Sequence, residues 1–268
     1  MSYSPPACGT SKAPEIPALA SAGPYLSRLS ARSALFTELG LIMGEKLSAP
    51  VDIDYRKLVI EENCLGRASL AARKKLWQEL RSRYRLDESY PLFCAFKKEW
   101  TSSRSEAEKG LTAYILFALN DRLVADLGTT WLFPLLRQAP AHIRPGDVRA
   151  FIESASREHP EVMGWSDQTL QAVAQKYCSS IRDFGLATGK NQKMSVRPAL
   201  YGAPIRLLIE ALNQMQTPPF EIVSSPAFRL LGIDTSEIID ALGTLNGRNE
   251  LRFRIQGDVI EIELPRAA

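Results

Sequence analysis

The strongest constraint on the fold is a change of hydrophobic period in the second half of the chain. Between Ser166 and Phe184 the apolar residues recur every three to four positions, which predicts an amphipathic helix with Ser166 as N-cap and Gly185 as its end. In 186–198 polar and apolar residues alternate around the turn-like segment 189–192. A period of two on both sides of a turn predicts a β-hairpin.

The last part of the chain repeats this order. Residues 204–215 and 235–246 have helical spacing, and 251–264 alternates strongly around a Gly-Asp turn. Helix, turn, helix and hairpin is the order of a winged helix. We therefore expect winged-helix-like units at 145–200 and 204–265.

Helical patterns fill the first half of the chain. One runs from Tyr25 to about Leu47. In 54–84 a short helix capped by Asp54 and stopped at Gly66 precedes a longer helix capped by Ser69, which is a helix-turn-helix-like arrangement. The predicted fold class is mostly α, with helix-turn-helix or winged-helix-like units, small β-hairpins and two helical subdomains.

Two proline-rich segments suggest the domain limits. Residues 1–24 hold five prolines and no periodic pattern, which predicts a flexible tail. The run 138–146 holds two prolines and a glycine, so we place a boundary there. The expected domains are 25–140 and 141–268.

No enzyme signature emerges from the residues. His142 and His159 have no nucleophile or acid near them in sequence, and the four cysteines form no closely spaced metal-binding pair. Gly185–Lys190 resembles a phosphate loop but has one residue too few between its glycines. Asp258, Glu261 and Glu263 could suggest a metal site, but the alternation places Glu261 and Glu263 on the solvent face of a strand, so a solvated hairpin is the better interpretation. We expect no catalytic residues, no metal, no cofactor and no small-molecule substrate.

The expected cellular location follows from the absence of membrane-spanning and secretion signals in this sequence. The longest apolar stretch, 111–119, is about half the length that a membrane-spanning helix needs, and no signal-peptide pattern is present. The cysteines are too dispersed to indicate a disulfide framework. A cytoplasmic protein with reduced cysteines and no membrane contact is expected.

The first basic face lies in 56–85, where nine basic and three acidic residues give a net charge of +6, against +3 for the whole chain. Helical spacing puts Leu70, Trp77, Leu80 and Tyr84 on one packing face with a cationic stripe beside it. Cations in such a stripe neutralise phosphates with release of counterions. An ordinary solvated helix face is the alternative. The expected phosphate contacts are Arg67, Arg73, Lys74, Arg81 and Arg85.

The second face lies on the helix 167–184, opposite its apolar stripe. It gathers amide and guanidinium groups within about 80° of arc and no acid: Gln168, Gln171, Gln175 and Arg182. Gln pairs bidentately with adenine and Arg with guanine in the major groove. The hairpin that follows could hold the flanking backbone with Lys190, Lys193 and Arg197. The alternative is an ordinary polar surface.

The final unit has the opposite charge. Residues 207–265 hold four basic and nine acidic residues, a net of −5. Phosphate repels such a unit, so we expect it to pack internally or to bind a protein.

The segment from Glu61 to Tyr84 resembles the signature of the BrxA family of bacteriophage-exclusion (BREX) defence systems. The matching residues are Glu62, Asn63, Leu65, Gly66, Arg67, Ser69, Arg73, Arg83 and Tyr84. Later similarities are Trp165-Ser166, Phe184-Gly185-Leu186 and Arg197-Pro198. The tail 1–24 departs from the family pattern.

The resemblance implies a small, mostly helical protein that binds DNA and acts beside methyltransferase, ATPase and phosphatase-like partners against phage. The family is also similar to RNA-binding antitermination proteins, so RNA stays open as a ligand. We expect a non-enzymatic component that binds double-stranded DNA and contacts other BREX proteins. The alternatives are a protein–protein adaptor and an RNA-binding protein.

Overall fold

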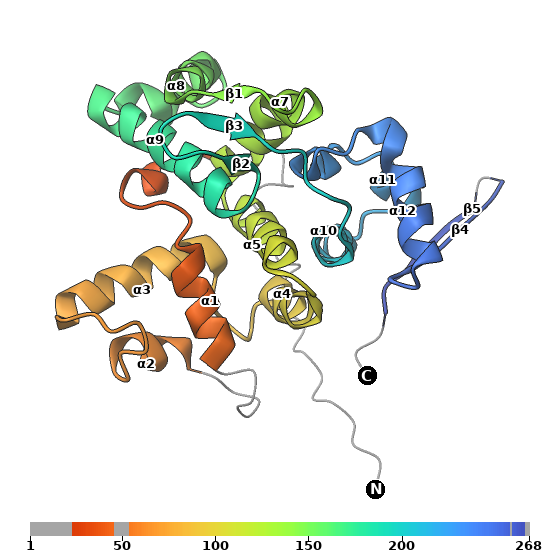
Figure 1. Ribbon diagram of the computed structural model, residues 1–268, viewed down its shortest axis with the longest axis horizontal. Helices are drawn as coiled ribbons and strands as arrows, with labels where there is room; N and C mark the ends of the chain where they lie inside the picture. The colour runs from red at the N-terminus through yellow and green to blue at the C-terminus, as the bar shows by residue number, and fades with distance from the viewer. Residues whose placement is uncertain (1–22, 46–53, 258, 266–268) are drawn as a thin grey trace, which may run out of the picture.

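Helices dominate the fold, as a computed structural model that describes residues 23–45, 54–257 and 259–265 shows. Within these ranges the strands form one three-stranded and one two-stranded antiparallel sheet (Figure 1). The prediction of a mostly α fold with small β-hairpins is confirmed. The tail predicted at 1–24 falls, except for its last two residues, outside the described residues.

The first half contains nine helical elements in the described part of the chain. They are η1 (Ser27–Ser30), α1 (Phe36–Glu45), α2 (Tyr55–Ile60), α3 (Leu70–Tyr84), α4 (Pro91–Ser102), α5 (Glu106–Asn120), α6 (Arg122–Asp126), η2 (Leu127–Leu132) and α7 (Phe133–Arg137). The predicted caps are confirmed, because an Asp54 carboxylate oxygen accepts from Lys57 N at 3.0 Å and Ser69 Oγ accepts from Ala72 N at 3.1 Å.

Three local predictions in this half are wrong. The helix expected from Tyr25 to Leu47 is broken, because Leu35 has a φ of +57° and turns the chain between η1 and α1. The helix α2 ends at Ile60, before Gly66. Leu70, expected on the packing face of α3, is 49% exposed; it is the first residue of the helix, whereas Trp77 and Leu80, further along, are buried.

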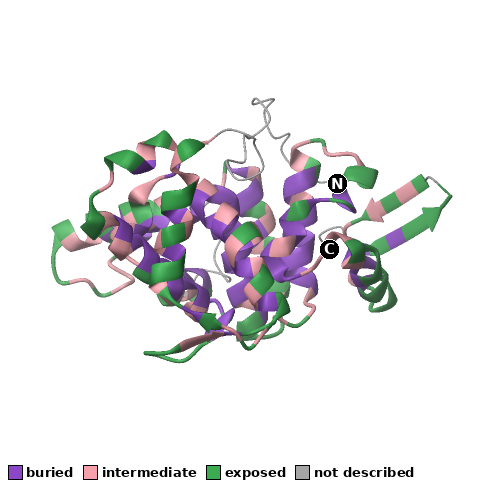
Figure 2. Cartoon of the chain, turned by 90° about the horizontal axis from the view of Figure 1, so that it is seen from above, coloured by how far each residue is buried: buried purple, intermediate pink, exposed green. Residues whose placement is uncertain are grey.

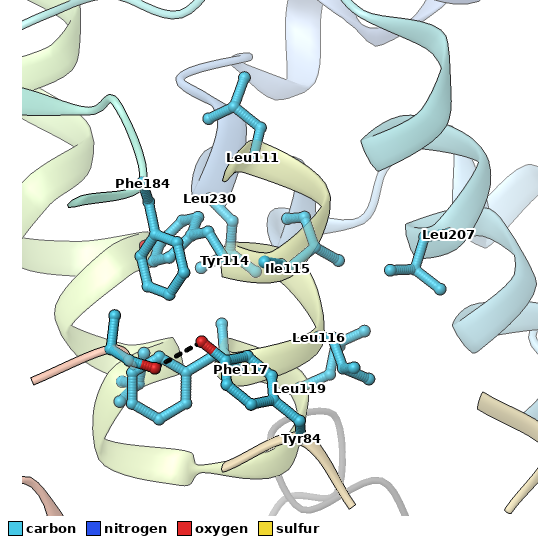
Figure 3. Close-up of a cluster of buried hydrophobic side chains, with 14 of the residues drawn as sticks. Tyr84, Leu111, Tyr114, Ile115, Leu116, Phe117, Leu119, Phe184, Leu207 and Leu230 are labelled. Atoms are coloured by element: carbon cyan, nitrogen blue, oxygen red, sulfur yellow. Dashed lines mark hydrogen bonds between the residues drawn. The ribbon is translucent and has the colours of Figure 1, made fainter. Parts of the chain in front are cut away.

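The helix α5 forms the centre of the molecule. Its apolar run, too short for a membrane span, is buried on all sides because α3, α4 and α10 pack around it. Its side chains Tyr114 and Phe117 both pack against the ring of Phe184, and Phe117 also packs against Tyr84 (Figure 3). A Cβ on Gly110 would lie 2.9 Å from the carbonyl oxygen of Phe184, so a glycine permits this close approach.

The next segment contains the first helix–helix–hairpin unit. Its elements are β1 (His142–Ile143), α8 (Pro145–Ser154), η3 (Ala155–Arg157), η4 (Pro160–Gly164), α9 (Asp167–Asp183), β2 (Ala187–Thr188) and β3 (Lys193–Ser195). Ser166 caps α9, as predicted, by accepting from Thr169 N at 3.2 Å. The hairpin β2–β3 is confirmed, and β1 adds a third strand beside β3. The sequence did not indicate β1 because two residues are too few to show a period.

The last segment forms a second unit of similar order. Its elements are α10 (Gly202–Gln214), α11 (Pro219–Ile222), η5 (Pro226–Leu231), η6 (Thr235–Glu237), α12 (Ile238–Gly247), β4 (Arg252–Gln256) and β5 (Val259–Glu263). The strands pair with Phe253 opposite Ile262, which confirms the predicted hairpin. This hairpin projects from the body (Figure 1), and most of its surface is exposed or half-buried (Figure 2).

The buried side chains of both halves belong to one hydrophobic cluster that extends from Tyr25 to Phe253. A buried ion pair joins the halves, with Arg206 of α10 2.6 Å from Glu99 of α4.

The boundary predicted at 138–146 coincides with the connection from α7 through β1 to α8. The division into two domains stays a prediction.

Candidate nucleic-acid interface

The segment between α2 and α3 is a tight turn built by Asn63 and Gly66. Both residues have a positive φ, +54° and +62°. The side-chain oxygen of Asn63 accepts from Arg67 N at 2.7 Å, and Ser69 then starts α3. Asparagine and glycine tolerate the left-handed conformation that this turn requires. The motif that resembles the family signature therefore fixes where α3 begins.

Two of the expected phosphate-binding residues make structural contacts. Arg67 forms an ion pair with Glu38 of α1 at 2.9 Å, and its side chain stays 40% exposed. Arg73 is half-buried and donates to the carbonyl of Ile60 at 2.7 Å, at the end of α2. A charge count cannot reveal these partners, which hold α1 and α2 against the region of α3.

The stripe predicted along α3 lies on the surface. Lys74, Arg81 and Arg85 are exposed, while Trp77 and Leu80 are buried on the other side of the helix. The guanidinium of Arg85 lies 4.4 Å from the centre of the Tyr90 ring, a cation–π contact that orients it. Of the nine basic residues in 56–85, six are exposed: Arg56, Lys57, Lys74, Lys75, Arg81 and Arg85.

The Arg-Tyr pair at the end of α3 is buried and holds another part of the backbone. Arg83 is 1% exposed and donates to the carbonyls of Arg32 at 2.8 Å and Ser33 at 3.0 Å. Tyr84 donates to the carbonyl of Ala34 at 2.6 Å, the dashed line in Figure 3. Burial raises the pKa of the Tyr84 hydroxyl, so it stays protonated and donates. These bonds fix the backbone between η1 and α1.

The amide-rich face of α9 is directed away from the core. Gln168 and Gln175 are exposed, and Gln171 is half-buried. Arg182 is half-buried and contacts Asp183 at 2.8 Å. The opposite side of the helix is buried, with Val173, Tyr177 and Ile181 among its residues. The sequence pattern thus placed these polar groups on the correct side of α9, and their contact with DNA stays a prediction.

The basic residues of the first hairpin are divided between solvent and protein. Lys190 is exposed at the turn, and Lys193 Nζ donates to its carbonyl at 3.1 Å. Arg197 lies 3.5 Å from Glu237, which also bonds Arg137 at 2.6 Å. The hydrogen bond from Arg137, with a smaller contribution from Arg197, lowers the pKa of Glu237. Arg197 is therefore partly neutralised by the second unit.

A polar groove lies between the α3 and α9 faces. Its volume is about 550 Å³, and it is lined by the segment 31–38, by Lys75 of α3 and by residues of α9 that include Lys176 and Arg182. Of the predicted residues, only Arg182 lines it. The sequence analysis did not include Arg32, Lys75 and Lys176, because only the fold brings these cations together.

No metal or membrane feature is found in the described part of the chain. No group of three histidine, cysteine, aspartate or glutamate side chains there could hold a metal ion. Among the described helices, none has the length and apolar character needed to cross a bilayer.

Comparisons with known proteins give two findings. A family model described as BrxA matches residues 23–212. A crystal structure of an uncharacterized protein from Magnetospirillum magneticum has a TM-score of 0.57 to this fold at 16% sequence identity, over 78% of this chain and 98% of that chain. At this identity the likeness concerns the fold alone. No curated protein matches the sequence.

Proposed function

From the premise that this chain belongs to the BrxA family, and so takes part in BREX phage defence, we propose that it is a non-enzymatic DNA-binding component of that system. One observation carries the proposal. Two exposed faces, on α3 and α9, hold cations and amides on the sides of these helices that are directed away from the core. Such groups neutralise phosphates and read base edges.

Each face has a distinct task in this proposal. Lys74, Arg81 and Arg85 contact phosphates of double-stranded DNA. The exposed part of the Arg67 side chain, which also pairs with Glu38, adds a further phosphate contact. The units α8, α9 and β1–β3 act as a winged helix, in which Gln168, Gln171 and Gln175 lie in a groove of the duplex. Lys190 and Lys193 contact the flanking backbone. Phosphate contacts give affinity, and amide contacts give sequence preference.

The test is a binding titration of the full chain with a labelled 30-base-pair duplex over a salt series. The triple variant K74E/R81E/R85E should abolish binding at moderate salt. The replacement of these residues by glutamine should lower the salt slope by about 0.9 per lost phosphate contact. The matched control R248E/R252E/R254E changes the charge equally, but on the acidic second unit, and should bind nearly as well as wild type. Thermal unfolding checks that each variant is folded.

Unchanged affinity in K74E/R81E/R85E would remove the stripe of Lys74, Arg81 and Arg85 from the site. A wild-type protein that does not shift the duplex at low salt would refute DNA binding altogether. A single-stranded RNA of the same length, titrated in parallel, decides between the two nucleic acids. Tighter binding to RNA would favour the antitermination-like alternative.

A second candidate is an adaptor that docks other defence proteins. The second unit favours it, because Phe220, Ile239, Ile255 and Val259 are between 44% and 61% exposed on a surface with a net negative charge. A contiguous exposed apolar patch, unlike a single residue, often marks a protein contact, and Ile255 and Val259 lie on the same hairpin. Co-purification of a BREX partner with wild type, lost in F220S/V259S while DNA binding is kept, would support this function.

A further inference from the structure

The polar groove between α3 and α9 contains more cationic than anionic side chains. Its cations are Arg32, Lys75, Lys176 and Arg182, and its two carboxylates are Glu38 and Asp183. Arg67 already pairs with Glu38 at 2.9 Å, and Arg182 already pairs with Asp183 at 2.8 Å. Within the described part of the chain, Arg32, Lys75 and Lys176 form no ion pair. The groove therefore offers uncompensated positive charge from α3, from α9 and from the segment between η1 and α1.

The floor of this groove is fixed before any ligand arrives. Arg83 bonds the carbonyls of Arg32 and Ser33, Tyr84 bonds that of Ala34, and η1 packs against α9. The backbone that carries Arg32 cannot move without breaking these hydrogen bonds of the buried Arg83 and Tyr84 side chains. A site that is already ordered loses little conformational entropy when it binds.

The groove lies on a different side of α3 from the stripe described above. Successive residues of a helix are rotated by about 100°, so Lys75 is directed away from Lys74. Lys75 lines the groove beside α1 and α9, whereas Arg81 lines a separate hollow beside α2. The two sets of cations on α3 can therefore be tested independently.

We propose that this groove binds phosphates of the DNA backbone where the strand passes from the α9 face to α3, with Arg32, Lys75 and Lys176 as the contacting cations. This inference rests on the proposed DNA binding. It also gives the groove a positioning role. Arg182 lies both on the amide-rich face of α9 and in the lining of the groove. A strand held in the groove therefore sets the register of Gln168, Gln171 and Gln175 on the duplex.

The experiment compares K75E/K176E with K75R/K176R in the titration with the 30-base-pair duplex. The glutamate variant should bind roughly tenfold or more weakly at moderate salt, and K75Q/K176Q should lower the salt slope by about 1.8, the loss of two phosphate contacts. The arginine variant should keep wild-type affinity, because the charge is retained. All three should unfold close to the wild-type temperature, since Lys75 is exposed, Lys176 is half-buried, and neither forms an ion pair within the described part of the chain.

The outcomes separate this inference from the function on which it rests. If wild type binds the duplex, K74E/R81E/R85E does not, and K75E/K176E binds like wild type, the groove proposal is overturned while DNA binding stands. If wild type binds no duplex, both fail. Inorganic pyrophosphate and ATP are titrated as further probes. If either binds through Lys75 and Lys176 while duplex affinity does not depend on them, the groove is a site for free phosphates and the proposal is overturned.

Discussion

The two helix–helix–hairpin units have a similar element order and differ in how each hairpin is held. In the first, β3 lies between β1 and β2, and the hydroxyl of the buried Ser195 donates to the carbonyl of Leu135 at 2.7 Å. In the second, β4 pairs with β5 alone, and Val259 is 60% exposed. Their net charges also have opposite sign, +1 over 145–200 and −4 over 204–265. Element order therefore does not settle what such a unit contacts.

The largest expected effect on the free energy of unfolding comes from breaking the buried ion pair that attaches the second unit to α4. Arg206 of α10 is 8% exposed at its side chain and pairs with Glu99 at 2.6 Å, so E99A removes the closer of its two carboxylate partners and leaves the buried guanidinium only Glu250 at 3.3 Å. We expect a loss of about 3–5 kcal/mol in the free energy of unfolding, measured by urea titration. The double variant E99M/R206M should lose less than E99A. A loss below about 1 kcal/mol in E99A would mean that the second unit does not depend on this pair.

The hairpin turns provide a matched pair of glycine substitutions. A Cβ on Gly189 would lie 2.0 Å from the carbonyl oxygen of Gln192, and its φ is +86°. At Gly257, with a φ of +60°, the space is open. We expect G189A to cost about 2–3 kcal/mol and G257A about 1 kcal/mol, because only the first must also displace backbone. Equal losses in urea unfolding would contradict a tighter first hairpin.

A buried hydroxyl distinguishes the two hairpins further. Ser195 Oγ also accepts from Ala141 N at 3.0 Å, so it connects β3 to the segment before β1. S195A should cost about 1–2 kcal/mol, since the Ala141 amide and the Leu135 carbonyl, both on half-buried residues, lose their partner. The control S154A removes an exposed hydroxyl that donates to the carbonyl of Phe151 and should change little. Equal losses in the two variants, measured by urea unfolding, would show that Ser195 is not specially important.

The smallest effect is expected at the tip of the second hairpin. V259T should change the free energy of unfolding by less than about 0.5 kcal/mol, because Val259 is largely exposed. The measurement is thermal unfolding at several protein concentrations. A larger, concentration-dependent loss would show that this hairpin is covered by a second chain in solution.

Elements with local signals were predictable from the sequence. Ser166 caps α9, and the alternation after Phe184 gives the first hairpin, because both signals lie within the element itself. The break at Leu35 was not predictable, since it depends on Arg83 about fifty residues away. The ion pair of Arg67 with Glu38 was equally invisible. Likewise Arg32, Lys75 and Lys176 share a groove only through tertiary structure.

The bonds of Arg83 and Tyr84 also have a consequence for synthesis on the ribosome. The segment 28–34 leaves the exit tunnel early, yet its backbone partners follow in α3 and its packing surface follows only in α9. Tyr25 is likewise held by a residue far along the chain, because its backbone amide donates to the carboxylate of Glu161. The segment 25–34 must therefore wait until α9, which ends at Asp183, has emerged before it can reach its native place. Nascent chains stalled before α9 should remain sensitive to protease near η1.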